Sequence, residues 1–285
     1  MVKVVLINRL LLYFASIIMA GIGVFFMLFA GDGRALTAGK ARNLLLPGTG
    51  LWERRTGERL IALAFDGGPD PAATGRILDL LKEYNAKATF FVAGRRAELY
   101  PELILHLVRE GHELGNQTYT QRAVDGLSEE ELCLDLYRAH RVIHGITGEN
   151  MRLFRPASGF GARTRAGKTI LRAAKALGYE VILSSRGEEK DDWHTATGEE
   201  IAREILKNVQ PGEIISFPGQ GDGGSNTLQA LRLLLPVLEE RGYRFVTVSE
   251  LLRAARGIER TMFLPPKKWA DDKAGLFAGF IRTSR

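Results

Sequence analysis

Residues 59–70 read RLIALAFDGGPD, an apolar run that ends at an acid and is followed by a turn. A short apolar run bounded by glycine and proline is typical of a fully buried strand. The chain therefore leaves a sheet at Asp66, and Gly67 and Gly68 turn the backbone. Asp66 is then either a reactive carboxylate at a strand end or a carboxylate that caps the turn.

Short apolar runs alternate with amphipathic stretches as far as residue 252, which is typical of βα units and a parallel sheet. About 230 residues of such units suit one closed or nearly closed barrel. We expect an α/β fold of the distorted (β/α)7 parallel-barrel type, with an open doubly wound sheet as the alternative. Further strands are expected at 88–93, 112–115, 151–155, 180–185, 212–217 and 244–248. Helices are expected at 72–84, 100–110, 128–147, 166–177, 199–209 and 227–241, and from 249 onward.

Composition excludes several classes of protein. The chain has 285 residues, of which 25% are charged and 45% hydrophobic, and this usage is globular rather than disordered or collagen-like. Its net charge of +6 favours anionic surfaces, but the basic residues are scattered, so we expect no nucleic-acid partner. The single cysteine, Cys133, excludes an internal disulfide and a cysteine-based zinc site.

Residues 10–30 read LLLYFASIIMAGIGVFFMLFA and carry no charge. A helix of this length spans roughly 30 Å, which matches one bilayer core. The run is longer than the apolar region of a cleaved signal, and no small-residue cleavage site follows it. We therefore predict a transmembrane signal anchor, with a cleaved signal peptide or a buried core helix as alternatives. The predicted regions are a short cytoplasmic segment (1–9), the anchor (10–30), a tether (31–55), an extracytoplasmic barrel domain (56–258) and a basic tail (259–285).

In a parallel barrel the chemistry lies in the loops that follow the strands. The loop after the first predicted strand contains AFDGGPD (64–70). Later strand-end loops contain, in chain order, NQTYTQ (116–121), RPASG (155–159), DDW (191–193) and PGQGD (218–222).

These motifs, in this order, resemble those of the polysaccharide deacetylase family, the NodB-homology type of carbohydrate esterase. The family's first loop reads roughly TFDDGP, and its third reads NHTYTH. The resemblance covers about Leu60 to Leu252. It implies a NodB-like barrel that removes N-acetyl groups from a polysaccharide of the peptidoglycan or chitin type, with a divalent metal such as zinc.

The chain departs from the family at the metal-binding positions. The resemblance places one aspartate and two histidines where this chain has Gly67, Gln117 and Gln121. An amide has no imidazole nitrogen, and its oxygen is a poor zinc ligand beside histidine or carboxylate. The family's general-acid histidine falls on Pro218, whose side chain has no proton to give. We therefore expect no metal and no cofactor.

The remaining family positions give Asp66 as the catalytic base and Arg155 as its partner. The expected substrate groove is lined by Gln117, Gln121, Asp192 and Trp193. Three of these residues also have a structural interpretation. Asp66 would cap the turn, Arg155 would pair with Asp66 to close the strand ends, and Trp193 would pack against its neighbours.

Other metal-binding positions are less suitable. His140 and His144 are four residues apart on the predicted helix 128–147, a spacing that metals use. They lie away from the strand-end loops, and we interpret them as surface histidines. Asp70 and Asp222 are rim carboxylates that could hold a hard cation weakly.

Two hypotheses for the function follow. The first is a catalytically degenerate family member that binds N-acetylated cell-envelope glycan or scaffolds envelope proteins. The alternative is an active polysaccharide N-deacetylase with a metal site that the sequence does not reveal. A zinc titration separates them, because only the second predicts stoichiometric zinc binding that depends on Asp66.

Overall fold

The computed structural model describes residues 58–124, 126–157, 164–183 and 196–256, all within the unit Pro47–Arg285. The predicted cytoplasmic segment, anchor, tether and basic tail lie outside these residues, so those assignments remain predictions. Within the described ranges, no helix has the length and apolar character needed to cross a membrane.

The described strands form one parallel sheet, and each corresponds to a predicted strand. The pairing order is β5-β4-β3-β2-β1-β6, and β7 pairs with the first residues of β1. The strands are β1 (Leu60–Asp66), β2 (Thr89–Val92), β3 (Glu113–Asn116), β4 (Leu153–Phe154), β5 (Glu180–Val181), β6 (Ile214–Pro218) and β7 (Arg244–Val246).

The sheet is a half-barrel, which corrects the expectation of a closed or nearly closed ring. β5 and β6 stand at the two ends of the pairing order in the described part of the chain. β4 and β5 pair over two residues only, so few backbone hydrogen bonds extend the sheet at that end. The α/β class and the parallel sheet are confirmed.

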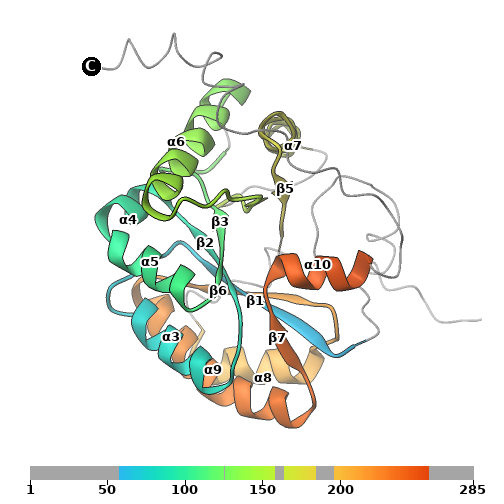
Figure 1. Cartoon of the computed structure of the whole chain (residues 1–285). Coiled ribbons are helices and arrows are strands. Elements are labelled where there is room, and N and C mark those ends of the chain that lie inside the picture. The colour runs from blue at the N-terminus through green and yellow to red at the C-terminus, as the bar shows by residue number, and fades with distance from the viewer. Residues whose placement is uncertain (1–57, 125, 158–163, 184–195, 257–285) are drawn as a thin grey trace, which may run out of the picture. The chain divides into compact units, whose positions relative to one another are not determined.

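Helices connect the strands, and all but the last lie along the outside of the sheet (Figure 1). The last helix, α10 (Val248–Arg256), packs on the inner face. Within the outer layer α8 packs against α9, and α6 packs against α7. Ser128 and Glu131 form a capping box that starts α6. The helices are α3 (Thr74–Glu83), α4 (Gly94–Leu99), α5 (Pro101–Arg109), α6 (Glu129–Thr147), α7 (Arg165–Leu177), α8 (Gly198–Asn208), α9 (Gly221–Glu240) and α10 (Val248–Arg256).

Two helical segments differ from the sequence-based expectation. The short helix α4 was not predicted, and α9 begins at Gly221 rather than near residue 227. Glycine and polar residues at the start of α9 suggested a loop. However, a Cβ atom at Gly224 would lie 2.8 Å from the Cβ of Ala73. Glycine therefore permits the first turn of α9 to lie against the start of α3.

Side chains of β1 alternate between two apolar layers. Ile61, Leu63 and Phe65 belong to the larger core under the outer helices. Leu60, Ala62 and Ala64 belong to a second cluster on the inner face, together with Phe91 and residues of α10. Successive residues of a strand point to opposite faces. Asp66, two residues after Ala64, therefore continues the inner row and lies at its open end.

Candidate functional site

Three strands bring polar side chains to the inner face beside Asp66. On β6, Ser216 follows the inner-face residue Ile214 by two positions, and Pro218 pairs directly with Asp66. Arg155 follows β4 and is buried. The alternation of the strands thus places an acid, a hydroxyl and a guanidinium at one end of the half-barrel.

Asp66 and Arg155 form an ion pair at this end of the sheet. Arg155 Nη1 donates to Asp66 Oδ2 at 3.0 Å and to Oδ1 at 3.3 Å, and it also contacts Ser216 Oγ. The guanidinium carbon lies 4.5 Å from the centroid of the Phe91 ring, a cation–π contact. Arg155 Nε and Nη2 have no hydrogen-bond acceptor among the residues that the structure describes. The structure therefore brings together the two predicted catalytic positions.

Two opposing effects act on the pKa of Asp66. Burial raises it, because a low-dielectric environment disfavours the carboxylate, while the charge and hydrogen bond of Arg155 lower it. Burial is the larger effect, so the pKa lies above the ordinary value for aspartate. Asp66 is therefore a stronger base than an exposed aspartate, although its oxygens already accept hydrogen bonds.

Gln117 and Gln121 form a chain of amides that ends at Asp66. Gln121 Nε2 donates to Gln117 Oε1 at 2.9 Å, and Gln117 Nε2 donates to Asp66 Oδ1 at 3.4 Å. An ionised carboxylate can only accept hydrogen bonds, which sets the direction of this chain. Gln117 is buried at 3% exposure, so its amide faces the protein interior rather than an open groove.

Local backbone geometry holds the two glutamines in place. Thr118 and Gln121 have φ values of 64° and 56°, which L-residues rarely adopt. Asn116 Oδ1 accepts from the Thr118 N–H at 2.8 Å, and Thr118 Oγ1 accepts from the Gln121 N–H at 3.0 Å. These bonds curl the loop so that Gln121 returns to Gln117.

The donors at the family's metal positions do not fit a metal ion. Gly67 has no side chain, and Gln117 and Gln121 offer neutral amides that are already bonded to each other and to Asp66. Zinc sites in proteins use histidine, cysteine or carboxylate ligands. Across the described ranges, no group of three or more His, Cys, Asp or Glu side chains could hold an ion.

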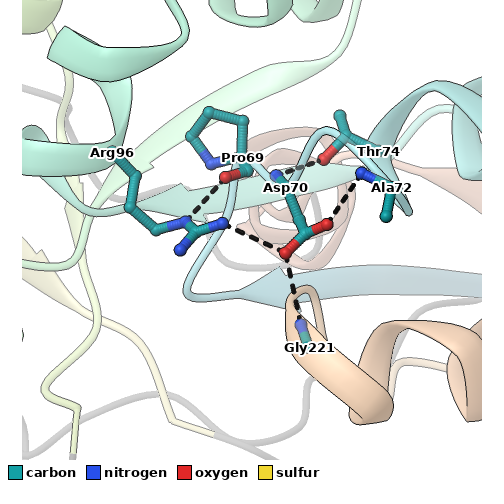
Figure 2. A network of polar contacts seen from close by, with 6 residues as sticks. All are labelled: Pro69, Asp70, Ala72, Thr74, Arg96 and Gly221. Carbon is teal, nitrogen blue, oxygen red and sulfur yellow. Dashed lines mark hydrogen bonds and ion pairs between the residues drawn. The ribbon is translucent and has the colours of Figure 1, made fainter.

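Asp70 is not the available rim carboxylate that the sequence suggested. Its Oδ2 accepts from Arg96 Nη2 at 3.0 Å and from the Gly221 N–H at 3.3 Å, and its Oδ1 accepts from the Ala72 N–H at 2.9 Å. Figure 2 shows this network, in which Arg96 Nε also donates to the Pro69 carbonyl at 2.7 Å. Asp70 therefore joins the loops that follow β1, β2 and β6.

The histidine pair on α6 also differs from its interpretation. His140 is buried at 5% exposure, and its ring stacks on that of His144 with centroids 5.8 Å apart. Its Nδ1 lies 3.4 Å from the hydroxyl of Tyr179, which accepts from Asn116 Nδ2 at 2.7 Å. His140 is therefore a core residue, because α6 packs this face on α7 and the sheet.

Other predicted residues cannot be placed. Asp192 and Trp193 lie outside the described residues, as does the side chain of Asp222. Sequence reasoning also missed Ser216 and Gln220, both of which lie beside predicted positions. Ser216 is a polar residue in an otherwise apolar strand, two positions before Pro218, and strand alternation could have identified it as inward-facing.

Comparison with known proteins assigns the family. The sequence profile described as polysaccharide deacetylase matches residues 53–182. A peptidoglycan-N-acetylglucosamine deacetylase of Bacillus cereus is 38% identical over 202 residues, which cover 71% of this chain and 92% of the relative. The chain belongs to the polysaccharide deacetylase family.

Solved structures of this family share the fold. A peptidoglycan deacetylase of Bacillus subtilis has a TM-score of 0.61 and 29% identity, covering 71% of this chain and 94% of the other. A mutant of a CE4 family pseudoenzyme from Bacillus anthracis, with restored enzymatic activity, has a TM-score of 0.64 and 26% identity, covering 73% and 72%. The deacetylase fold therefore occurs both in active enzymes and in a pseudoenzyme.

Proposed function

We propose that this chain is a catalytically degenerate polysaccharide deacetylase that holds no catalytic metal and binds N-acetylated cell-envelope glycan at its strand-end rim. The observation that carries the proposal is the amide chain from Gln121 through Gln117 to Asp66. In this chain the side chains at the family's two histidine positions form hydrogen bonds with each other and with Asp66, rather than with a metal ion. The names of the relatives, which are deacetylases of peptidoglycan, support a glycan of that class.

Magnitudes show why the loss of the metal matters. Hydrolysis of an acetamide near neutral pH requires an activated water and a stabilised oxyanion. Bound zinc brings the pKa of water from about 15.7 to about 7, which corresponds to about 12 kcal/mol. A carboxylate acting alone as a general base contributes about 3–5 kcal/mol. Asp66 cannot replace the difference, even with a pKa raised by burial.

The geometry opposite Asp66 also lacks an acid. Pro218 pairs with Asp66 across the β1–β6 pair, at the position of the family's general-acid histidine. Its ring carries no transferable proton, and its carbonyl accepts from Thr227 Oγ1 at 2.8 Å. A leaving amine would therefore find no proton donor at this position.

Binding and turnover can be measured together. The purified full-length chain would be mixed with N-acetylglucosamine oligomers and soluble peptidoglycan fragments, and its melting temperature and acetate release would be followed. The proposal predicts a higher melting temperature and no acetate. Acetate release that depends on Asp66 would support the active deacetylase instead. An unchanged melting temperature with every glycan would contradict glycan binding and favour a scaffolding role.

We also propose that residues 10–30 anchor the protein in a membrane with the deacetylase domain on the extracytoplasmic side. The proposal rests on the uncharged apolar run, which has the length of one bilayer core. Fractionation of cells that express the full chain should place it with the membranes. Recovery of most of the protein in the soluble fraction would contradict the anchor.

A further inference from the structure

The space beside Gly67 is filled by side chains from two other loops. Gly67 has a φ of 88°, and a Cβ atom built on it would lie 2.7 Å from Gln220 Nε2 and 2.9 Å from Gln220 Cδ. The same point lies 3.1 Å from Gln121 Nε2. Real Cβ atoms essentially never approach other heavy atoms below 3.0 Å. The amide of Gln220 therefore occupies the place from which a side chain at position 67 would extend.

Backbone contacts on both sides of Gln220 hold its backbone against this loop. Before it, the Gly219 N–H donates to the Asp66 carbonyl at 2.7 Å, and a Cβ atom at Gly219 would lie 2.9 Å from that oxygen. After it, the Gly221 N–H donates to Asp70 Oδ2 at 3.3 Å (Figure 2). Position 220 is thus held between two bonds to the segment that carries Gly67.

The conformation of Gly67 adds a second obstacle to a side chain. Its φ of 88° lies in a region that L-residues rarely adopt, because their Cβ atoms clash with the backbone. A carboxylate at position 67 would be strained, in addition to meeting the Gln220 amide. The first loop has therefore adapted to the absence of a side chain.

We propose that Gln220 excludes a divalent cation from this site by filling the place next to Gly67. Cation exclusion then has two causes. The family's ligands are absent at positions 67, 117 and 121, and a neutral amide from the β6–α9 turn fills the space into which a side chain at position 67 would extend. This inference rests on the proposed loss of the metal. It goes further, because it predicts that restoring the ligands alone does not restore tight binding.

The test compares two sets of substitutions in the full-length chain. The first is the triple variant Gly67→Asp, Gln117→His and Gln121→His, and the second adds Gln220→Ala. Zinc affinity would be measured by competition with a chelator of known affinity. We expect the quadruple variant to bind zinc at least about tenfold more tightly than the triple variant. Equal affinities, or tighter binding by the triple variant, would overturn the proposal.

A matched control uses another glutamine of the same helix. Gln229 is exposed on α9, so adding Gln229→Ala to the triple variant should leave zinc affinity unchanged. Zinc binding by the native chain, in contrast, would refute the proposed loss of the metal and leave the role of Gln220 to be judged by the variants. The two proposals therefore fail by different results.

If the triple variant does not fold, a double-mutant cycle that needs no metal tests whether Gln220 fills the space beside Gly67. Gly67→Ala would be made in the native chain and in the Gln220→Ala variant, and the melting temperature of each protein would be recorded. The strain of a positive φ is common to both backgrounds and cancels in the cycle. We expect a smaller loss of melting temperature when residue 220 is alanine. An equal loss in both backgrounds would show that Gln220 does not fill this space.

Discussion

Asp66 ends strand β1 and Asp70 lies four residues later in the loop that follows, yet their surroundings differ sharply. Asp70 accepts hydrogen bonds from Arg96 and from the backbone N–H groups of Ala72 and Gly221, and its side chain is 13% exposed. Asp66 is 26% exposed, and its partner Arg155 keeps Nε and Nη2 without an acceptor in the part of the chain that the structure describes. Asp70 is thus bonded to the loops around it, whereas Asp66 lies beside an arginine that has two N–H groups without an acceptor among the described residues.

The difference separates the contacts that hold the rim loops together, which centre on Asp70, from the candidate catalytic residues beside Asp66. The Asp70 network joins three of the loops that form the rim through contacts that involve no metal ion. Beside Asp66 the chain has Gly67 and the neutral amides of Gln117 and Gln121 at the positions that the family resemblance assigns to metal ligands. If the proposed loss of the catalytic metal is correct, the Asp70 network explains how the surrounding loops stay in place. The following predictions test this separation, from the largest expected effect to the smallest.

Replacing Arg155, the counter-ion of Asp66, should reduce the free energy of unfolding most. In Arg155→Met the partly buried carboxylate of Asp66 loses its counter-ion, and breaking a buried pair typically costs about 3–5 kcal/mol, so we expect a loss of about 3 kcal/mol here. The pKa of Asp66 would then rise further above its ordinary value, because burial acts without opposition. The loss should therefore be largest at neutral pH and shrink as the pH falls and Asp66 becomes protonated.

Urea unfolding at pH 7 and pH 5 measures this effect. Arg152→Met, at an exposed position near the start of β4, serves as the control and should change stability by less than about 0.5 kcal/mol. A loss that stays the same at both pH values would contradict the ion pair.

At the start of β3, lowering the pH should destabilise the protein through protonation of His112. His112, just before β3, has a pKa lowered to about 4 by burial, and its Nδ1 accepts from the Ala88 N–H at 3.2 Å. Because the folded-state pKa lies below the ordinary 6.5, His112 contributes stability above about pH 6.5 that is lost as the pH falls toward 4. The full loss is about 3 kcal/mol.

His112→Gln removes the titrating group and keeps an acceptor. The variant should therefore lose less stability than the native chain between pH 6.5 and pH 4, as judged by denaturant unfolding across this range. An identical pH dependence in the two proteins would show that His112 does not control the acid response. His140, whose pKa is also lowered to about 4 by burial, remains in both proteins.

Removing the Asp70 network should reduce stability less than removing the ion pair of Arg155 with Asp66. Asp70→Ala removes the acceptor for Arg96 and two backbone N–H groups, all of which are partly open to water. We expect a loss of about 2 kcal/mol, as for hydrogen bonds to a charged group. Asp79→Ala, at an exposed position on α3, is the control. If both variants melt at the same temperature, Asp70 does not hold the three loops together.

The smallest effect is expected from the amide chain. Gln117→Met keeps the length of the side chain but removes the hydrogen bonds to Asp66 and Gln121. Asp66 retains Arg155, so the expected cost is about 1 kcal/mol. If Gln117→Met lowers the melting temperature more than Asp70→Ala does, the amide chain contributes more to stability than the Asp70 network, contrary to this prediction.

Much of the fold follows from local sequence patterns. The alternation of apolar runs with amphipathic stretches predicted the parallel α/β sheet, and each described strand lies within or beside its predicted range. The closed or nearly closed barrel that we expected is a half-barrel, because pairing between distant strands depends on tertiary contacts that periodicity does not report. Helix α9 was predicted six residues too late, because its glycine-rich start depends on the close approach of Ala73.

The site was predictable where motifs carried it. The pairing of Asp66 with Arg155 and the closeness of Gln117 and Gln121 agree with the expected arrangement of strand-end loops. Gln220 was not predictable, because its position depends on bonds from Gly219 and Gly221 to a segment about 150 residues earlier in the chain. His140 was misplaced because a helix pattern does not show how much of the helix circumference its neighbours cover.

Calorimetric titration of the native full-length chain with zinc, beside the Asp66→Ala variant, tests the central claim most directly. The account predicts no saturable binding near one zinc per chain in either protein, because a glycine and two amides occupy the positions of the family's metal ligands. Binding of one zinc per native chain that disappears in Asp66→Ala would contradict it and would identify an active metal site.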